Sequence, residues 1–334
     1  MKICFKFLLN LTNLNLFRKS IIIFIISIYS CDIVQDNKSE IKKIPIEIKL
    51  ERFDKYFYDK EKYSLKSLKE KFPFFFPITY SDSVWVKKRN DTLIRILNSE
   101  ISKKIINNSL LIDPLKLMFK HIKYYFPNYQ IPRVISVSNN VDYNNRIIMN
   151  DSLLIISIDT YLGSENKIYN GIPNFIRYEM DLSFLTSHVI NKFSKYHVKK
   201  TNDRTFLAEI IYHGKKHYLK DLLLPNNNEK IKIGFSEKKL RWAKENEIFI
   251  WKYFIENKLL YSTNQELMNR FINPAPFSKF YLELDNESPG KIGQWIGWNI
   301  VKSYVKNNPT VSLSEILKKS EFEIFQYSKY KPLK

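Results

Sequence analysis

The chain has 334 residues, of which 44% are hydrophobic and 15% aromatic, and its formal net charge is +20. Its aromatic content excludes an intrinsically disordered protein, because disordered chains are poor in aromatic residues. Only 7 residues are glycine, which disfavours a glycine-rich nucleotide-binding loop. The basic residues are scattered, and no finger, RNP-like or basic-zipper pattern accompanies them, so we expect no nucleic-acid partner.

The first thirty residues have the pattern of a secretory signal. Positions 2, 6, 18 and 19 carry the only charges before residue 31, and an apolar run follows at 21–28. A basic segment, a short apolar core and a small residue before the cut are typical of such a signal. The apolar run is shorter than the ~20 residues that a permanent span needs. The alternative interpretation is an uncleaved signal anchor with an incidental cysteine.

Cys31 follows Ile28, Tyr29 and Ser30 in a segment that resembles the lipobox of bacterial lipoproteins. In those proteins the cysteine thiol receives a diacylglycerol, and the signal is cut just before it. We therefore predict a lipoprotein signal peptide at 1–30, with diacylglycerol and an acyl chain such as palmitate on Cys31. Cleavage would lower the formal net charge to +16 and leave one of the two cysteines, which excludes a disulfide within the mature chain.

The polar segment 31–43 has no apolar periodicity and predicts a flexible tether between membrane and domain. We expect residues 44–334 to form a single globular domain of the α+β class, which is predominantly helical and has a small antiparallel sheet. A strand is expected at 44–50, where apolar and polar residues alternate. Helices are expected at 62–72, 91–106 and 113–125, the last beginning at an Asp-Pro pair.

Three short apolar runs, at 134–137, 146–149 and 153–158, are separated by asparagine-rich turns. This pattern predicts an antiparallel meander of three strands. From residue 174 onward the periodicity becomes helical. The expected helices are 174–198, 204–222, 236–260, 264–271, 290–307 and 312–318.

Two histidines, His213 and His217, have the four-residue spacing of the metalloprotease helix. Gly214 stands where the general base would be, and two lysines between the histidines would repel a divalent cation. His188, on an expected helix at 181–193, has a lysine rather than a histidine four residues on. No nucleophile elbow or phosphate loop is found. We therefore predict no catalytic residue, no metal and no cofactor besides the lipid.

Three of the seven glycines, Gly290, Gly293 and Gly297, lie within eight residues, with Trp295 between them and Trp298 directly after them. Glycine inside a helix costs about 1 kcal/mol relative to alanine, so a glycine-lined face implies the close approach of another backbone. Two interpretations remain open. The glycines serve internal helix packing, or the five residues form a cleft wall or docking surface.

Nine segments stand out in order along the chain. They are Arg52-Phe53-Asp54, His121 to Pro127, Asp159 to Gly163, Ile211 to Lys216, Asn246 to Ser262, Ala275 to Tyr281, Ser288-Pro289-Gly290, Trp295 to Trp298 and Ser328 to Pro332. Together they resemble the gliding motility lipoprotein GldB family. The resemblance extends from about residue 44 to the C-terminus, and the lipobox stands where that family has one.

The resemblance implies a lipoprotein of the cell envelope that is needed for surface gliding. It implies association with the motility machinery and with the secretion system coupled to it, so the expected partners are the membrane, through the lipid, and envelope proteins. The family has no established catalytic residues. Only Cys31 is carried over, as the acylated residue.

A second resemblance concerns the order of the later helices. A helix, then one containing Ile211 to Gly214, then one with Gly293 and Gly297 is similar to zincin-type peptidases. Residues 187–192 would then occupy the place of the H-E-x-x-H helix without its ligands, which implies a metal-less zincin-like scaffold. This scaffold suggests one alternative function, a divergent peptidase-like hydrolase with a cleft next to 187–217. The charge of +16 on the mature chain suggests another, a module that binds an acidic envelope polymer.

Overall fold

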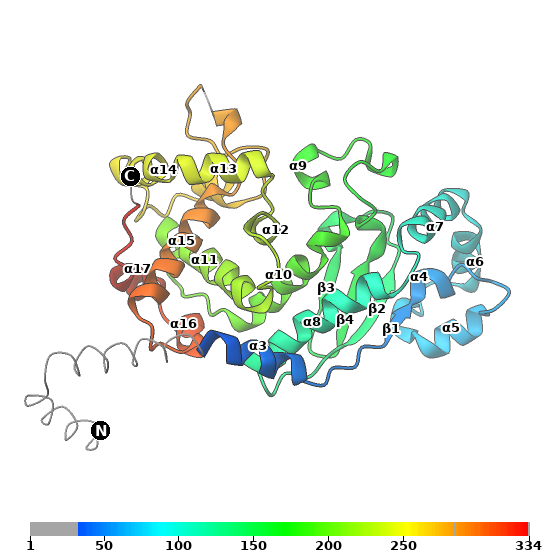
Figure 1. The fold of residues 1–334 in the computed structure, drawn as a ribbon. Coiled ribbons are helices and arrows are strands. Elements are labelled where there is room, and N and C mark those ends of the chain that lie inside the picture. The colour runs from blue at the N-terminus through cyan, green and yellow to red at the C-terminus, as the bar shows by residue number, and fades with distance from the viewer. Residues whose placement is uncertain (1–32, 284, 333–334) are drawn as a thin grey trace, which may run out of the picture. The chain divides into compact units, whose positions relative to one another are not determined.

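The computed structural model describes residues 33–283 and 285–332 (Figure 1). The expected signal peptide and Cys31 therefore lie outside the described residues. The chain comprises two units, Met1–Ile46 and Glu47–Lys334. In the first unit, helix α3 spans Ile33–Lys43, where the sequence analysis expects a tether without regular structure. Gln, Lys and Glu are good helix formers, so the polar composition of this stretch does not prevent a helix.

Four strands form one mixed sheet in the order β1-β2-β4-β3. The strands are β1 (Leu50–Arg52), β2 (Arg133–Val137), β3 (Ile147–Met149) and β4 (Leu153–Ser157). The β1–β2 and β2–β4 pairs are parallel, and only β3 and β4 are antiparallel. The α+β class and the small sheet are confirmed, whereas the expectation that the sheet is antiparallel is wrong.

The parallel pairing follows from the composition of the central strands. Both β2 and β4 are nearly continuous apolar runs, which are typical of parallel strands covered on both faces. After β2 the chain passes to the far side of β4 and pairs there as β3. The turn into β4 is closed by Asn150 N–H, which donates to the carbonyl oxygen of Leu153 at 2.9 Å. The first strand begins only at Leu50, at the end of the expected range 44–50.

Five α-helices lie between β1 and β2. They are α4 (Phe53–Tyr56), α5 (Leu65–Lys71), α6 (Asp82–Asn90), α7 (Thr92–Lys104) and α8 (Ser109–Tyr125). Helix α8 begins at Ser109 rather than at Asp113, so that Pro114 lies inside it. Helix α6 was not expected, because its apolar residues Val84, Trp85 and Val86 are consecutive rather than three or four apart.

The helical C-terminal half is confirmed, with more interruptions than expected. Its α-helices are α9 (Asn174–Arg177), α10 (Leu185–His197), α11 (Phe206–Leu223), α12 (Glu229–Ile233), α13 (Glu237–Glu245), α14 (Glu247–Glu256), α15 (Ile292–Asn307), α16 (Leu313–Lys318) and α17 (Glu321–Ser328). The expected helix 174–198 is divided into α9 and α10, and 236–260 is divided at Asn246. The range 264–271 overlaps a π-helical turn, Met268–Ile272.

Helices α11 and α15 cross with their backbones in direct contact. A Cβ atom added to Gly297 would collide with the carbonyl oxygen of Ile210, and one added to Gly214 would collide with the carbonyl oxygen of Gly297. A Cβ atom on Gly293 would lie 2.9 Å from the carbonyl oxygen of Phe271. Glycine is therefore needed at these positions for space rather than for backbone flexibility.

Gly290, Gly293, Trp295, Gly297 and Trp298 are all buried. The relative solvent-accessible surface areas of Trp295 and Trp298 are 2% and 0%. These five residues therefore form no exposed surface, which favours internal helix packing over a cleft wall or docking surface. The physical reason is the crossing of α11 and α15, which uses the glycine-lined face for packing inside the chain.

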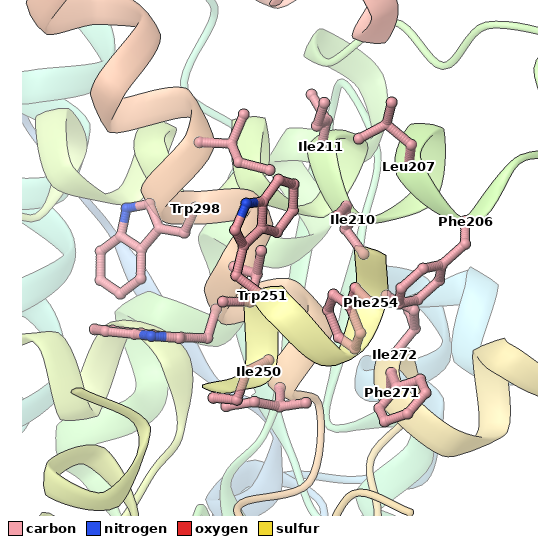
Figure 2. Close-up of a cluster of buried hydrophobic side chains, with 14 of the residues drawn as sticks. Phe206, Leu207, Ile210, Ile211, Ile250, Trp251, Phe254, Phe271, Ile272 and Trp298 are labelled. Carbon is pink, nitrogen blue, oxygen red and sulfur yellow. The ribbon is translucent and has the colours of Figure 1, made fainter. Parts of the chain in front are cut away.

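An apolar core surrounds this crossing (Figure 2). Phe206 of α11 lies beside Phe254 of α14 and Phe271 of the π-helical turn, with ring centroids 5.0 and 5.7 Å apart. Ile210 points toward these rings from α11, and Trp298 lies on the facing helix. Aromatic pairs at such separations add to the stabilisation from burial.

Replacing Gly297 by alanine should destabilise the protein by about 1–3 kcal/mol, because the added methyl group forces α11 and α15 apart. In an unconstrained helix the same change would be favourable by about 1 kcal/mol. Urea unfolding monitored by circular dichroism measures the difference. Lys306→Ala, at an exposed position of the same helix, is the matched control and should change stability by less than about 0.5 kcal/mol. A Gly297→Ala variant as stable as the wild type would contradict the close approach.

Candidate functional site

The region 187–217 lies on α10 and α11. A cleft next to this region is the site that the alternative function, a hydrolase, would use. His217 Nε2 donates to Gln294 Oε1 at 2.9 Å, and its ring lies 5.4 Å from that of Trp298. His213, one turn earlier, lies beside the ring of Tyr212. Within 33–283 and 285–332, no group of three or more His, Cys, Asp or Glu residues is placed to hold a metal ion. The histidine pair thus has no third ligand among these residues.

The structure instead joins four residues that the sequence analysis did not connect. Glu179 Oε2 accepts from His188 Nε2 at 2.9 Å, and Oε1 accepts from Lys291 Nζ at 2.8 Å. The hydroxyl of Tyr161 is 3.0 Å from His188 Nδ1. We call Tyr161, Glu179, His188 and Lys291 the Glu179 network.

The backbone positions each member of the Glu179 network from a different segment. Tyr161 follows β4, Glu179 follows α9, and His188 lies on α10. Lys291 adopts a left-handed conformation, with φ 63°, directly before α15. Gly234 lies against the Glu179 carboxyl group, since a Cβ atom there would collide with it. No spacing rule connects these segments, so no local sequence signal pointed to the network.

The charges within the Glu179 network follow from burial and from pairing. Burial favours the neutral carboxyl group, but the charge of Lys291 and the hydrogen bond from His188 outweigh it and hold the pKa of Glu179 well below its usual range. Burial lowers the pKa of His188 to about 4, so the imidazole is neutral at pH 7. Burial also raises the pKa of Tyr161 far above its usual value. The tyrosine is therefore a neutral phenol and not an activated nucleophile.

Two lysines of α11 are buried and bonded inside the fold. Lys215 Nζ forms an ion pair with Glu321 Oε1 at 2.8 Å and donates to the carbonyl oxygen of Lys319. Lys220 Nζ donates to the carbonyl oxygen of Lys232 at 2.5 Å. These bonds connect α11 to α12 and to the start of α17, so both side chains hold elements together rather than face a substrate.

The segment 52–54 is buried as well. Arg52 Nη2 lies 2.5 Å from Asp54 Oδ2, and Arg52 Nη1 donates to Asn108 Oδ1 at 3.0 Å. Ser136 Oγ, on β2, donates to the other carboxylate oxygen of Asp54. This ion pair joins the end of β1 to β2 and α8, which is a structural role.

Two further segments singled out in the sequence bind each other. Ser278 N–H donates to Ser288 Oγ at 3.0 Å, and Ser278 Oγ donates to the carbonyl oxygen of Pro289 at 2.7 Å. Gly290 packs on the backbone of Ala275, where a Cβ atom would collide with the carbonyl oxygen. The segments 275–281 and 288–290 are therefore joined before α15 through the buried Ser278 and Ser288.

The neutral state of His188 in the folded chain predicts how the free energy of unfolding depends on pH. Its pKa is lower in the folded chain than in the unfolded chain, so the unfolded chain takes up a proton first as the pH falls below about 6.5. His188 therefore adds stability that is present above pH 6.5 and lost toward pH 4. Between pH 7 and pH 5 the wild type should lose about 2 kcal/mol more than His188→Gln, which keeps a hydrogen-bonding side chain. Urea unfolding at the two pH values measures this, and equal losses would contradict a buried, neutral His188.

The comparisons with known proteins bear on the whole chain rather than on one residue. A family model described as gliding motility protein GldB matches residues 34–332. No curated protein and no solved structure matches the chain. In the part of the chain that the structure describes, no helix is long and apolar enough to cross a membrane. Because the family model covers nearly the whole chain, the protein belongs to the gliding motility protein GldB family.

Proposed function

We propose that the protein is a non-catalytic, lipid-anchored component of the cell envelope that serves the gliding motility machinery and the secretion system associated with it. The observation that carries this proposal is the family match over 34–332, which begins three residues after Cys31. Diacylglycerol and an acyl chain on Cys31 would attach the chain to a membrane, and envelope proteins of the machinery would be its partners. Nucleic acid has no part in this function.

The bonding of the polar groups on α10 and α11 supports a role without catalysis. His188 and His217 each bond another side chain, and Lys215 and Lys220 bond groups from distant segments. A general base or nucleophile needs access to substrate and a pKa near the working pH. Burial lowers the pKa of His217 far below its usual value, which removes it from that range.

A peptidase-like hydrolase of the envelope is the second candidate. It rests on the zincin resemblance, which concerns the order of the helices that contain 187–192, 211–214 and 293–297, here α10, α11 and α15. Metal analysis of the purified protein separates the two candidates. Stoichiometric zinc, together with peptide cleavage that is lost in His213→Ala and His217→Ala, would overturn the non-catalytic proposal.

The anchor is tested with Cys31→Ala and with Cys4→Ala as its matched control, since these are the two cysteines of the chain. Metabolic labelling with an alkyne fatty acid should mark the wild type and Cys4→Ala but not Cys31→Ala. Crosslinked pull-downs from membranes should recover motility or secretion components with the first two proteins only. Labelling of Cys31→Ala would contradict the attachment site, and recovery of abundant envelope proteins alone would contradict the role in the machinery.

A further inference from the structure

Four lysines lie on α10, α11 and the segment between them, and two of the four lie beside the ring of Tyr212. Lys192 and Lys195 lie one turn apart on α10, Lys216 lies on α11, and Lys200 lies in the connection. The Nζ atoms of Lys200 and Lys216 are 5.4 and 5.5 Å from the ring centroid of Tyr212. We call Lys192, Lys195, Lys200 and Lys216 the lysine cluster.

The lysine cluster carries more positive charge than its surroundings neutralise. Lys200 pairs with Glu209 at 2.5 Å. Over the described ranges, Lys192, Lys195 and Lys216 form no ion pair. The neighbouring buried lysines of α11, by contrast, bond a carboxylate or a carbonyl oxygen.

The position of Lys216 is the one that contacts within the fold explain least. It is partly buried, and burial together with Lys195, Lys192 and Lys200 lowers its pKa to about 8. Burying an ammonium group without a counter-charge is unfavourable. An exposed position on the same helix would avoid this cost, so the position of Lys216 indicates a ligand that compensates it.

Two uncharged groups complete the surroundings of Lys216. His213, one turn before it, has a pKa of about 3 because of burial and the nearby lysines, so the imidazole is neutral at pH 7. Tyr212 is partly buried and its pKa is raised by burial, so it keeps its hydroxyl proton. Both side chains are therefore neutral hydrogen-bonding groups beside the cations.

We propose that the lysine cluster is a binding site for a phosphate group. A phosphate dianion has about two negative charges and three acceptor oxygens, whereas a carboxylate has one charge and would leave most of the excess uncompensated. Ammonium groups bind phosphate as point charges and need no fork geometry. The site uses neither Cys31 nor the Glu179 network, so this inference does not depend on the proposed function.

The test is calorimetric titration of inorganic phosphate into the full-length protein in non-ionic detergent. Lys192→Gln/Lys216→Gln should weaken binding at least about ten-fold, the effect of losing one charge-assisted contact. The matched control is Lys87→Gln/Lys88→Gln, which removes two positive charges from α6. It should bind within about two-fold of the wild type. Lys192→Arg/Lys216→Arg, which keeps both charges, should bind with nearly the wild-type affinity, and thermal unfolding checks that all variants fold.

Absence of phosphate binding to the wild type would overturn the proposal. So would an equal loss of affinity in the α6 control, because the binding would then reflect net charge rather than the lysine cluster.

Proton uptake gives a second readout at pH 8. Lys216 is only partly protonated in the free protein at this pH, and a bound phosphate favours its charged form. Titrations in two buffers of different ionisation enthalpy should therefore show proton uptake, which should disappear in Lys216→Arg. The other groups that face Lys216 are Lys192, Lys195 and Lys200. Binding without proton uptake would contradict the role of Lys216.

Competition identifies the source of the phosphate group. Displacement of inorganic phosphate by phosphatidic acid vesicles, whose headgroup is a phosphate monoester, would support a lipid headgroup as the ligand. Displacement by soluble polyphosphate, but not by vesicles, would support a soluble phosphorylated polymer. Failure of both to displace inorganic phosphate would contradict a site that is open to phosphate-bearing ligands.

Discussion

The crossing of α11 and α15 sets the positions of most functional candidates in this chain. Gly214 and Gly297 lie where the two backbones touch, and a methyl group on either would collide with the facing helix. Helix α11 carries His213 and His217, and α15 begins directly after Lys291. A change in the separation of the two helices would therefore alter the apolar core and also the bond between His217 and Gln294.

The buried polar groups near this crossing connect segments that are far apart in sequence. Asp221 binds Lys232 at 3.0 Å and the indole N–H of Trp298 at 2.7 Å. Lys291 binds Glu179, which lies 112 residues earlier. A buried ion pair is weak evidence for added stability, because desolvation offsets much of its attraction. Its removal on one side is costly, however, so these pairs favour one arrangement of the helices over others.

The sequence predicts local structure better than pairing. The helical periodicity places α11, α15 and α16 within two residues of their observed bounds. It fails for α6, whose apolar residues are consecutive, and for the sheet, where the pairing of β2 with β4 depends on a crossover. The three glycines predict close backbone approach, and two interpretations were open from sequence alone. The structure shows that the backbones they approach, at Ala275, Phe271 and Ile210, belong to the same chain.

The candidate sites were less accessible to sequence reasoning than the fold. The Glu179 network joins four segments between residues 161 and 291, and no motif has that spacing. The sequence has 54 basic residues and does not set the lysine cluster apart from the others. Only the packing of α10 against α11 distinguishes an unpaired, partly buried lysine from a solvated one. The anchor residue, Cys31, is the reverse case: its prediction rests entirely on sequence and lies outside the described residues.

Native-state hydrogen exchange tests most directly whether the α11–α15 crossing is the feature on which the fold depends. The amides of α11 and α15 near Gly214 and Gly297 should exchange only by global unfolding, with a free energy equal to that from urea unfolding. The amides of α6 and α7 should exchange through smaller openings. If the amides at the crossing exchanged as readily as those of α6, the account would be contradicted.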